Sequence, residues 1–339
     1  YAQSQASMSV VASIPRNFLE MIAFGGVILL ILYIMAQTGS FNNALPIISL
    51  YVFAGYRLMP AMQKIYASFT VLAFVGPTLD KLTDDFRRLK PIEKHYDENI
   101  LPFNTKITLK NIKYNYPNAS RTALKDISLT IPAKSSVGLV GPTGSGKTTT
   151  VDIILGLLEP QEGKLEVDEN IITKQNSRSW QRSVGYAPQH IYLSDDTIAS
   201  NIAFGFNPKD ISQEAIEKAS KIANLHEFVV HELPNQYQTI IGERGVRLSG
   251  GQRQRIGIAR ALYNKPKVLI LDEATNALDS QTEDAVMDAI NNLSKNITII
   301  LIAHRLKTVK NCDIIFKFEK GQLKAQGTYN DIISSKSLE

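Results

Sequence analysis

The sequence contains almost no cysteine: Cys312 is the single cysteine among 339 residues. One cysteine cannot form a disulfide within its own chain, which excludes the class of small secreted domains held together by disulfides. We therefore expect Cys312 to be an ordinary, semi-buried thiol. The sequence also lacks an initial Met and a signal peptide, so we expect it to begin within a longer protein.

Charge of one sign is in small excess and is not gathered into a long run. The sequence has 37 Lys and Arg and 32 Asp and Glu, for a formal net charge of +5. The basic residues do not form a stripe with interleaved aromatic residues, which argues against nucleic-acid binding. A local basic cluster directly follows an apolar stretch, as is typical of a membrane flank. It consists of Lys81, Arg87, Arg88 and Lys90.

Charged residues are scarce in the N-terminal quarter of the chain, where two apolar stretches follow each other. Residues 18–36 contain one charge, Glu20, and a run of about 20 apolar residues is long enough to cross a bilayer as a helix. An uncharged turn over residues 37–43 precedes the second stretch, which runs from Ala44 to about Gly76. The pattern predicts a transmembrane helical hairpin. The alternative is a helix buried in a large soluble core.

The flanks of the hairpin indicate its orientation. Arg16 precedes the first stretch and Arg87 follows the second, whereas the turn between them has no Lys or Arg. Basic residues favour the cytoplasmic side, so both outer ends are predicted to be cytoplasmic. Arg57 lies well inside the second helix, where a cation is costly. It is predicted to meet an anionic substrate group in a cavity, to form a structural pair or to extend to the interface.

The first nucleotide motif is a glycine-rich loop between a predicted strand, residues 136–140, and a predicted helix, residues 149–158. The loop fits G-x-x-x-x-G-K-[ST], whose backbone N–H groups surround the phosphates of a nucleotide. Lys147 would neutralise phosphate charge and Thr148 would bind Mg²⁺. The predicted ATP-binding residues here are Gly141, Pro142, Thr143, Gly144, Ser145, Gly146, Lys147, Thr148 and Thr149.

The second motif is a hydrophobic run, residues 268–271, that ends in Asp272 and Glu273. Open α/β sheets bind their ligands at the carboxyl ends of the strands, where these two acids would lie. Asp272 is predicted to hold Mg²⁺, directly or through water. Glu273 is predicted to be the general base that polarises the attacking water.

A third motif narrows the class of nucleotide hydrolase. Leu248 is followed by Ser249, Gly250, Gly251 and Gln252, directly before a helix predicted over residues 252–262, and this start of a helix is a second anion site. Here the sequence resembles the ABC ATPase superfamily, whose LSGGQ signature contacts ATP held by the opposite cassette. The resemblance implies a head-to-tail homodimer with two ATP molecules between the cassettes.

Further family positions match residue by residue. Tyr116 resembles the aromatic residue that stacks on adenine, with Tyr114 as the alternative. Gln189 resembles the Q-loop glutamine, which senses Mg²⁺ and the attacking water. His304 resembles the switch histidine that contacts the γ-phosphate. With Glu273, these last two form the catalytic set that the resemblance implies.

Two further segments resemble parts of ABC exporters. Residues 276–279 resemble the D-loop, although the family more often has Ser where this chain has Asn276, so the geometry across the dimer interface can differ. Residues 242–245 resemble the X-loop of exporters, which touches the membrane domain. Ile240 replaces an acid there, so one coupling contact can differ.

The predicted fold class is therefore an α-helical transmembrane hairpin followed by an α/β P-loop ATPase domain with a helical subdomain. The domain boundaries are 1–90 for the last two membrane helices, 91–104 for a linker and 105–339 for the cassette. The helical subdomain is predicted at about 190–262. The order of hairpin and cassette resembles an exporter half, which implies a multi-pass protein of the bacterial inner membrane with its ATPase domain in the cytoplasm.

The transported substrate is indicated by a narrower resemblance. Residues 9–85 around Arg57, together with residues 81–86 and 124–127, resemble the bacterial lipid-linked oligosaccharide flippases of protein N-glycosylation. A polyprenyl-diphosphate glycan is then the expected substrate. Exporters of lipid A, of polysaccharide precursors or of drugs are alternatives. A soluble ABC ATPase and a nucleotide-gated channel or regulator are the alternatives from other classes.

Overall fold

The computed structural model describes residues 2–38, 41–89, 100–117, 119, 121–294, 296–304 and 306–334. The chain divides into two compact units, residues Tyr1–Glu93 and Lys94–Glu339, each of which is described by itself. Most of the predicted linker and the basic residue Lys90 lie outside the described residues.

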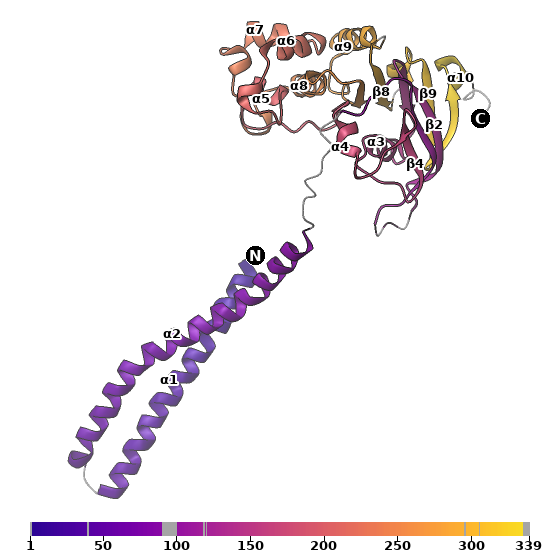
Figure 1. Cartoon of the computed structure of the whole chain (residues 1–339). Helices are drawn as coiled ribbons and strands as arrows, with labels where there is room; N and C mark the ends of the chain where they lie inside the picture. The colour runs from indigo at the N-terminus through magenta and orange to yellow at the C-terminus, as the bar shows by residue number, and fades with distance from the viewer. Residues whose placement is uncertain are drawn as a thin grey trace. The chain divides into compact units, whose positions relative to one another are not determined.

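The first unit is a pair of long helices, α1 (Ala2–Thr38) and α2 (Phe41–Arg88), which pack against each other (Figure 1). Both helices are longer than the apolar stretches that predicted them. A turn was predicted over residues 37–43, but the described residues among them, 37, 38 and 41–43, are helical. Helix α2 continues through Pro46, Pro60 and Pro77. Each of these prolines removes one backbone hydrogen bond without ending the helix.

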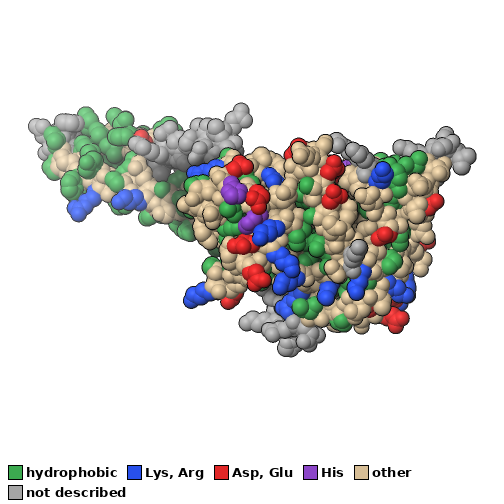
Figure 2. All heavy atoms as spheres, turned by 90° about the horizontal axis from the view of Figure 1, so that it is seen from above, with side chains coloured by type: hydrophobic (Ala, Val, Ile, Leu, Met, Phe, Trp, Pro, Cys, Tyr) green, Lys and Arg blue, Asp and Glu red, His purple; other side chains and the backbone are tan. Residues whose placement is uncertain are grey.

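Apolar side chains cover the outside of this helix pair. Among the residues described, two segments are long and apolar enough to cross a membrane, Glu20–Gln37 and Leu45–Arg88, and neither is buried within the unit. Phe24, Leu29 and Phe53 are each more than 60% exposed. Exposed apolar surface on this scale is unstable in water and is expected where lipid or other helices are the surroundings. Figure 2 shows the hydrophobic side chains that gather on this unit.

The second unit contains two sheets. The smaller one is antiparallel, in the order β2-β1-β4-β5, and the larger one has the order β10-β9-β3-β8-β7-β6. Strands β9, β3, β8, β7 and β6 are parallel, and β10 pairs antiparallel with β9. The strand bounds are β1 Lys106–Tyr114, β2 Leu124–Pro132, β3 Ser136–Val140, β4 Glu162–Val167, β5 Asn170–Ile171, β6 Val184–Ala187, β7 Val268–Asp272, β8 Thr298–Ala303, β9 Ile314–Glu319 and β10 Gln322–Gly327.

Every residue of β3, β7 and β8 is buried, as is expected of central parallel strands covered on both faces. The helices that accompany the two sheets are α3 Lys147–Ile154, α4 Ser177–Gln181, α5 Ile198–Ile202, α6 Gln213–Ile222, α7 His226–Glu232, α8 Gly250–Tyr263, α9 Ser280–Leu293 and α10 Tyr329–Ser334. Short 3-10 turns lie at Pro208–Asp210, Gln236–Gln238, Glu243–Gly245 and Leu306–Val309.

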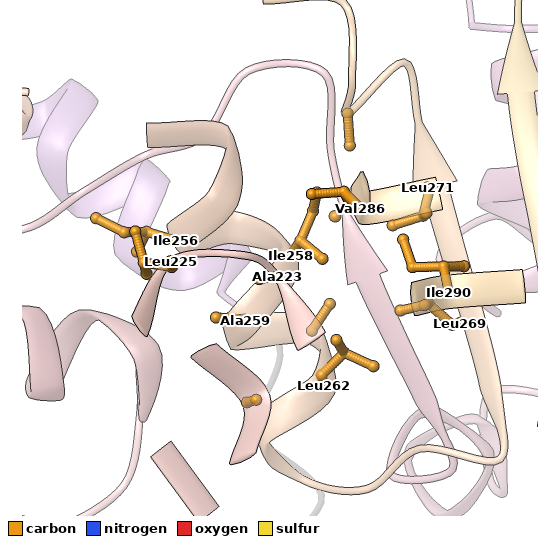
Figure 3. Close-up of a cluster of buried hydrophobic side chains, with 14 of the residues drawn as sticks. Ala223, Leu225, Ile256, Ile258, Ala259, Leu262, Leu269, Leu271, Val286 and Ile290 are labelled. Atoms are coloured by element: carbon orange, nitrogen blue, oxygen red, sulfur yellow. The ribbon is translucent and has the colours of Figure 1, made fainter. Parts of the chain in front are cut away.

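Helices α5 to α8 occur together between β6 and β7 and form a helical layer (Figure 1). Helix α8 connects this layer to the larger sheet, because it packs on β6 and β7 as well as on α5 and α6. Figure 3 shows Ile256 and Leu225 on the side of the helical layer and Ile258 toward Leu271 and Val286. The helix that follows the signature is therefore fixed relative to the strand that carries the acidic pair.

Candidate nucleotide site

The glycine-rich loop connects β3 to α3 in the conformation that its glycines predict. Gly141, Gly144 and Gly146 all have positive φ, and Gly146 is the residue before the first turn of α3. A Cβ atom on Gly141 would lie 2.2 Å from the carbonyl oxygen of Phe318. The loop therefore requires glycine there both for its backbone conformation and for its close approach to β9. Helix α3 begins at Lys147 and not at Thr149.

Lys147 lies at the centre of this loop. Its Nζ atom donates to the carbonyl oxygens of Gly141 at 2.8 Å and of Pro142 at 3.0 Å. Burial lowers the pKa of Lys147 and outweighs the opposing effect of the two acids, Glu273 and then Asp272. Those acids are therefore close enough to interact electrostatically with Lys147, so the loop and the acidic pair belong to one site.

The loop also contains a polar atom that the protein leaves without a partner. The buried Oγ atom of Ser145 has no hydrogen-bond partner among the residues that the structure describes. A buried hydroxyl of this kind is costly unless a ligand satisfies it. Next to it, Thr148 is exposed at the first turn of α3. One unpaired hydroxyl and one exposed hydroxyl at the partly positive start of a helix fit a bound phosphate.

Asp272 ends β7 and is 5% exposed. The Tyr186 hydroxyl on the neighbouring strand β6 donates to its Oδ2 atom at 3.4 Å. Burial, followed by the charge of Glu273, raises the pKa of Asp272, and burial together with Asp272 raises the pKa of Tyr186. Lys147 thus compensates the two adjacent acids only in part, and a divalent cation would supply further positive charge.

Protein side chains alone do not complete such a cation site. Among the described residues, no group of three or more His, Cys, Asp or Glu could hold a metal ion. The available donors are the oxygen atoms of Asp272, Thr148 and Gln189, and oxygen donors of this kind are typical of Mg²⁺, which usually completes its shell with water and substrate phosphates. The residues present therefore fit Mg²⁺ bound together with a nucleotide.

Glu273 is the centre of the hydrogen bonds in this site. The His304 Nε2 atom lies 2.5 Å from its Oε1 atom, and Gln189 Nε2 donates to Oε2 at 2.9 Å. Asn276 Nδ2 also donates to Oε2, at 2.8 Å. Glu273 is 9% exposed and adopts a left-handed backbone conformation with φ of 52°. Segments that follow β6, β7 and β8 therefore converge on a single carboxylate.

The two candidate adenine-stacking residues differ in exposure. Tyr114 is 7% exposed and belongs to the core, whereas Tyr116 is 41% exposed. The Tyr116 hydroxyl lies 3.2 Å from Thr149 Oγ1, and the two tyrosine rings meet edge to face. The exposed ring beside the phosphate loop is Tyr116, which favours it for a base-stacking role.

Ser249 is the N-cap of α8 and forms a reciprocal capping box with Gln252. The backbone N–H of Ser249 donates to Gln252 Oε1 at 2.8 Å, and the backbone N–H of Gln252 donates to Ser249 Oγ at 3.2 Å. Gly250 and Gly251 face the D-loop residues Ala277 and Leu278. The helix includes both glycines, so it begins two residues earlier than predicted.

The structure adds three residues that the motifs did not identify by role. Asn276 and Tyr186 contact the two acids, as described above. Gln254, which is 7% exposed, accepts from the backbone N–H of Ala277 at 2.9 Å and donates to the carbonyl oxygen of Glu273 at 3.4 Å. The only signal for Gln254 in the sequence is its position two residues after the signature.

A cavity of about 360 Å³ lies between these segments. Gln189, Gly250, Gln254 and Asn276 contribute to its lining. The Q-loop, the signature and the D-loop of one chain therefore border the same space.

The convergence of these motifs agrees with the comparison to known families. Residues 124–276 match the family model described as "ABC transporter". The chain carries the ATPase domain of an ABC transporter.

Three curated relatives are similar to this chain. The chain is 41% identical over 233 residues to the ATP-binding cassette sub-family B member 5 of Mus musculus, which covers 68% of this chain and 18% of that protein. It is 40% identical over 232 residues to the ATP-dependent lipid A-core flippase of Escherichia coli, covering 68% and 40%. It is 36% identical over 279 residues to the ABC multidrug transporter mdr1 of Aspergillus fumigatus, covering 82% and 20%.

The solved structure of a bacterial Atm1-family ABC exporter with ATP bound resembles the chain with a TM-score of 0.73 and 29% identity. The match covers 99% of this chain and 59% of that chain. The chain therefore spans less than two thirds of the relatives that it matches. Its fold is that of an ABC exporter with two candidate membrane spans among the residues described.

Proposed function

We propose that this chain is part of an ABC exporter half that uses ATP hydrolysis to move a lipid-linked oligosaccharide, a polyprenyl-diphosphate glycan, across the bacterial inner membrane. The convergence of Gln189, His304 and Lys147 on the acidic pair is the single observation that carries the ATPase part of this proposal. In this assignment, residues 1–90 are the last two membrane helices, 91–104 are a linker and 105–339 are the cassette.

We assign a separate role in ATP binding or hydrolysis to each of these residues. Lys147 and the N–H groups of the loop from Gly141 to Thr148 hold the phosphates of ATP, and Tyr116 stacks on the adenine. Thr148, Asp272 and Gln189 would hold Mg²⁺. The bound ion would neutralise phosphate charge. Phosphoryl transfer needs mainly positioning and charge stabilisation.

Glu273 then acts as the general base. Its carboxylate accepts hydrogen bonds from Gln189 and His304, which orient it beside the phosphate loop. A carboxylate fixed in this way polarises a water molecule and takes its proton as that water attacks the γ-phosphorus. The bond from the γ-phosphorus to the bridging oxygen breaks in the same displacement, and ADP leaves with that oxygen. The side chain of His304 is 37% exposed, and its Nε2 atom faces Glu273. A hydrogen bond from His304 to the phosphate therefore requires a second proton on the ring or a turn of the ring.

The partner is a second copy of this chain. Ser249, Gly250, Gly251 and Gln252 form a preorganised helix start with its own capped N–H groups. We assign it to the ATP held by the partner, which gives a head-to-tail homodimer with two ATP molecules between the cassettes. This arrangement explains why one chain carries two anion-binding helix starts.

The lipid assignment rests on the membrane unit. Arg57 is exposed on α2, and a cavity of about 460 Å³ between α1 and α2 is lined by its neighbours Gly55 and Tyr56 and by Glu20. Arg57 lies outside that lining, on another face of α2. In the complete membrane domain we assign this face to the substrate path, where a guanidinium would stabilise a diphosphate.

A second candidate substrate class is favoured by the relatives. One of them is named for the flipping of lipid A core and another for the transport of multiple drugs. Lipid A also carries phosphate on a lipid, so Arg57 would serve it equally well.

The decisive experiment measures the flipping of a fluorescent lipid-linked oligosaccharide in liposomes that contain the full-length protein, with Mg²⁺ and ATP. We expect flipping with wild-type protein and none with Glu273→Gln. Lipid A and a cationic drug, tested in the same liposomes, are the competing substrates. Movement of either one without movement of the oligosaccharide lipid would replace the proposed substrate, and the absence of ATP hydrolysis would refute the ATPase assignment itself.

A further inference from the structure

Asn276 contacts the carboxylate at the centre of the site. Its amide donates to Glu273 Oε2 at 2.8 Å, beside the bond from Gln189 to the same oxygen. With His304 on Oε1, the carboxylate has three neighbours. Since a carboxylate has about four lone-pair positions, roughly one remains for a water molecule. The donors thus define the direction in which Glu273 can accept a proton.

Asn276 differs from the other two donors in its origin. Gln189 follows β6 and His304 follows β8, so both are carried by segments remote in sequence from Glu273. Asn276 belongs to the same turn as Glu273, and its backbone N–H donates to the Glu273 carbonyl oxygen at 3.1 Å. Its contact with the base is therefore built into a four-residue turn.

That turn is fixed from two sides. Gln254 of α8 accepts from the backbone N–H of Ala277 at 2.9 Å. On the other side, Thr275 Oγ1 donates to Glu283 of α9 at 3.0 Å. The buried amide of Gln254 comes from the helix that begins with the signature. The turn therefore cannot swing without breaking these bonds.

We propose that Asn276 is a positioning residue for ATP hydrolysis: its amide holds the Glu273 carboxylate in the orientation that accepts the proton of the attacking water. The proposal rests on the assignment of Glu273 as the base. The amide of Asn276 reaches this carboxylate from within the same turn.

The first test compares Asn276→Ala with wild type in the full-length protein. Alanine removes the hydrogen bond to the charged carboxylate of Glu273, so we expect kcat to fall about 10-fold or more. The KM for ATP and the binding of a fluorescent ATP analogue should stay within about twofold, because ground-state binding does not use this contact. Asn330→Ala, an exposed asparagine on α10, is the matched control.

A second variant keeps the shape of the side chain. Asn276→Asp is nearly isosteric but replaces the donor by a carboxylate that repels Glu273. We expect a larger loss of kcat than for alanine, again with nucleotide binding retained. An aspartate variant with wild-type kcat would overturn the proposal, as would an alanine variant whose kcat is unchanged or raised.

A double-mutant cycle separates positioning from general support of the fold. In a Glu273→Gln background, Asn276→Ala should cause no further loss of single-turnover hydrolysis, because the residue acts through the carboxylate. A full additional loss in that background would overturn the proposal. If Glu273→Gln itself retained wild-type turnover, the proposed base would fail, and with it this inference; a failure in lipid flipping alone would leave the inference intact.

Discussion

Glu273 is the side chain on which the proposed hydrolysis depends. Its replacement by Gln keeps the size of the side chain but removes its charge, one of its two acceptor oxygens and its ability to take a proton. We expect Glu273→Gln to bind ATP and to hydrolyse it at least about 10²-fold more slowly, since general bases contribute factors of that order. The measurements are phosphate release and nucleotide binding on the same preparation. Hydrolysis at the wild-type rate would remove Glu273 from the role of base.

Arg57 is the residue whose replacement probes the substrate. If it meets a diphosphate, Arg57→Ala should reduce ATPase activity stimulated by the lipid substrate more than basal activity, because the cassette itself is untouched. Lys64→Ala, on the same helix, is the control. Equal loss of both activities would indicate a structural role for Arg57.

The sequence predicts a chemical role for single residues but not the contacts that they make. Lys147, Asp272 and Glu273 belong to short motifs whose spacing reflects how a strand end and a helix start bind phosphate. The contact between Asn276 and Glu273 depends on the left-handed backbone at Glu273, which is an uncommon conformation for Glu. Tertiary structure imposes that conformation, so no local pattern indicates it.

At the scale of elements, the turn at Asp168 stabilises the fold outside the candidate nucleotide site. Its carboxylate accepts from the backbone N–H groups of Asn104, Thr105 and Lys106 and from the Thr105 hydroxyl. Burial raises the pKa of Asp168, but these four hydrogen bonds together outweigh it, and the net pKa is lowered. The entry into β1 is thereby tied to the turn after β4.

A pH dependence of stability follows from this lowered pKa. The stabilising contribution of Asp168 is fully present above the pKa of the unfolded chain, about 3.9, and is lost as the pH falls through the lower, folded pKa. Asn tolerates the positive φ of 44° at this position, so Asp168→Asn removes the charge without backbone strain.

We expect Asp168→Asn to lower the thermal unfolding midpoint at pH 7, and the difference from wild type to shrink below about pH 4. Thermal unfolding at both pH values measures this. A difference that is the same at both would show that the charge of Asp168 does not contribute.

The limits of pattern reading are clearest at the ends of elements. The helix after the signature was predicted from residue 252, but α8 begins at Gly250, because the Ser249 cap and Gln252 stabilise a helix start that includes two glycines. The first helix was predicted from residue 18 but extends back to Ala2, since polar residues outside the apolar run continue it. Hydrophobic pattern indicates the part that needs an apolar environment and not the full length of a helix.

At the scale of the whole molecule, strand order is the feature that sequence patterns did not supply. Strand β3 lies between β8 and β9, which occur much later in the sequence. Strand β6 pairs with β7, although the helices of the helical layer separate these two strands in the sequence. This order places the segments that carry Gln189, Glu273 and His304 together at the carboxyl ends of three neighbouring parallel strands, β6, β7 and β8. The family resemblance implied that the three residues act together, whereas their separate positions in the sequence did not.

The proposed sandwich predicts complementation between two inactive chains. Lys147→Ala inactivates the phosphate loop and Ser249→Arg inactivates the signature. A homodimer of either variant therefore has no competent site. A mixed dimer regains one site, built from the intact loop of one chain and the intact signature of the other.

We therefore expect the co-expressed pair to recover about a quarter of wild-type ATPase activity if chains pair at random and sites act independently. Each variant expressed alone is the control. No recovery in isolated mixed dimers would show that the signature does not act across the interface.

The length of α2 has a mechanical consequence. Its 48 residues extend about 72 Å at 1.5 Å per residue, more than twice the hydrocarbon thickness of about 30 Å. A displacement at one end of such a helix is transmitted along it wherever its backbone hydrogen bonds are intact. One backbone hydrogen bond is absent at each of Pro46, Pro60 and Pro77. Any bending of α2 should therefore concentrate at these three prolines and leave the turns between them stiff.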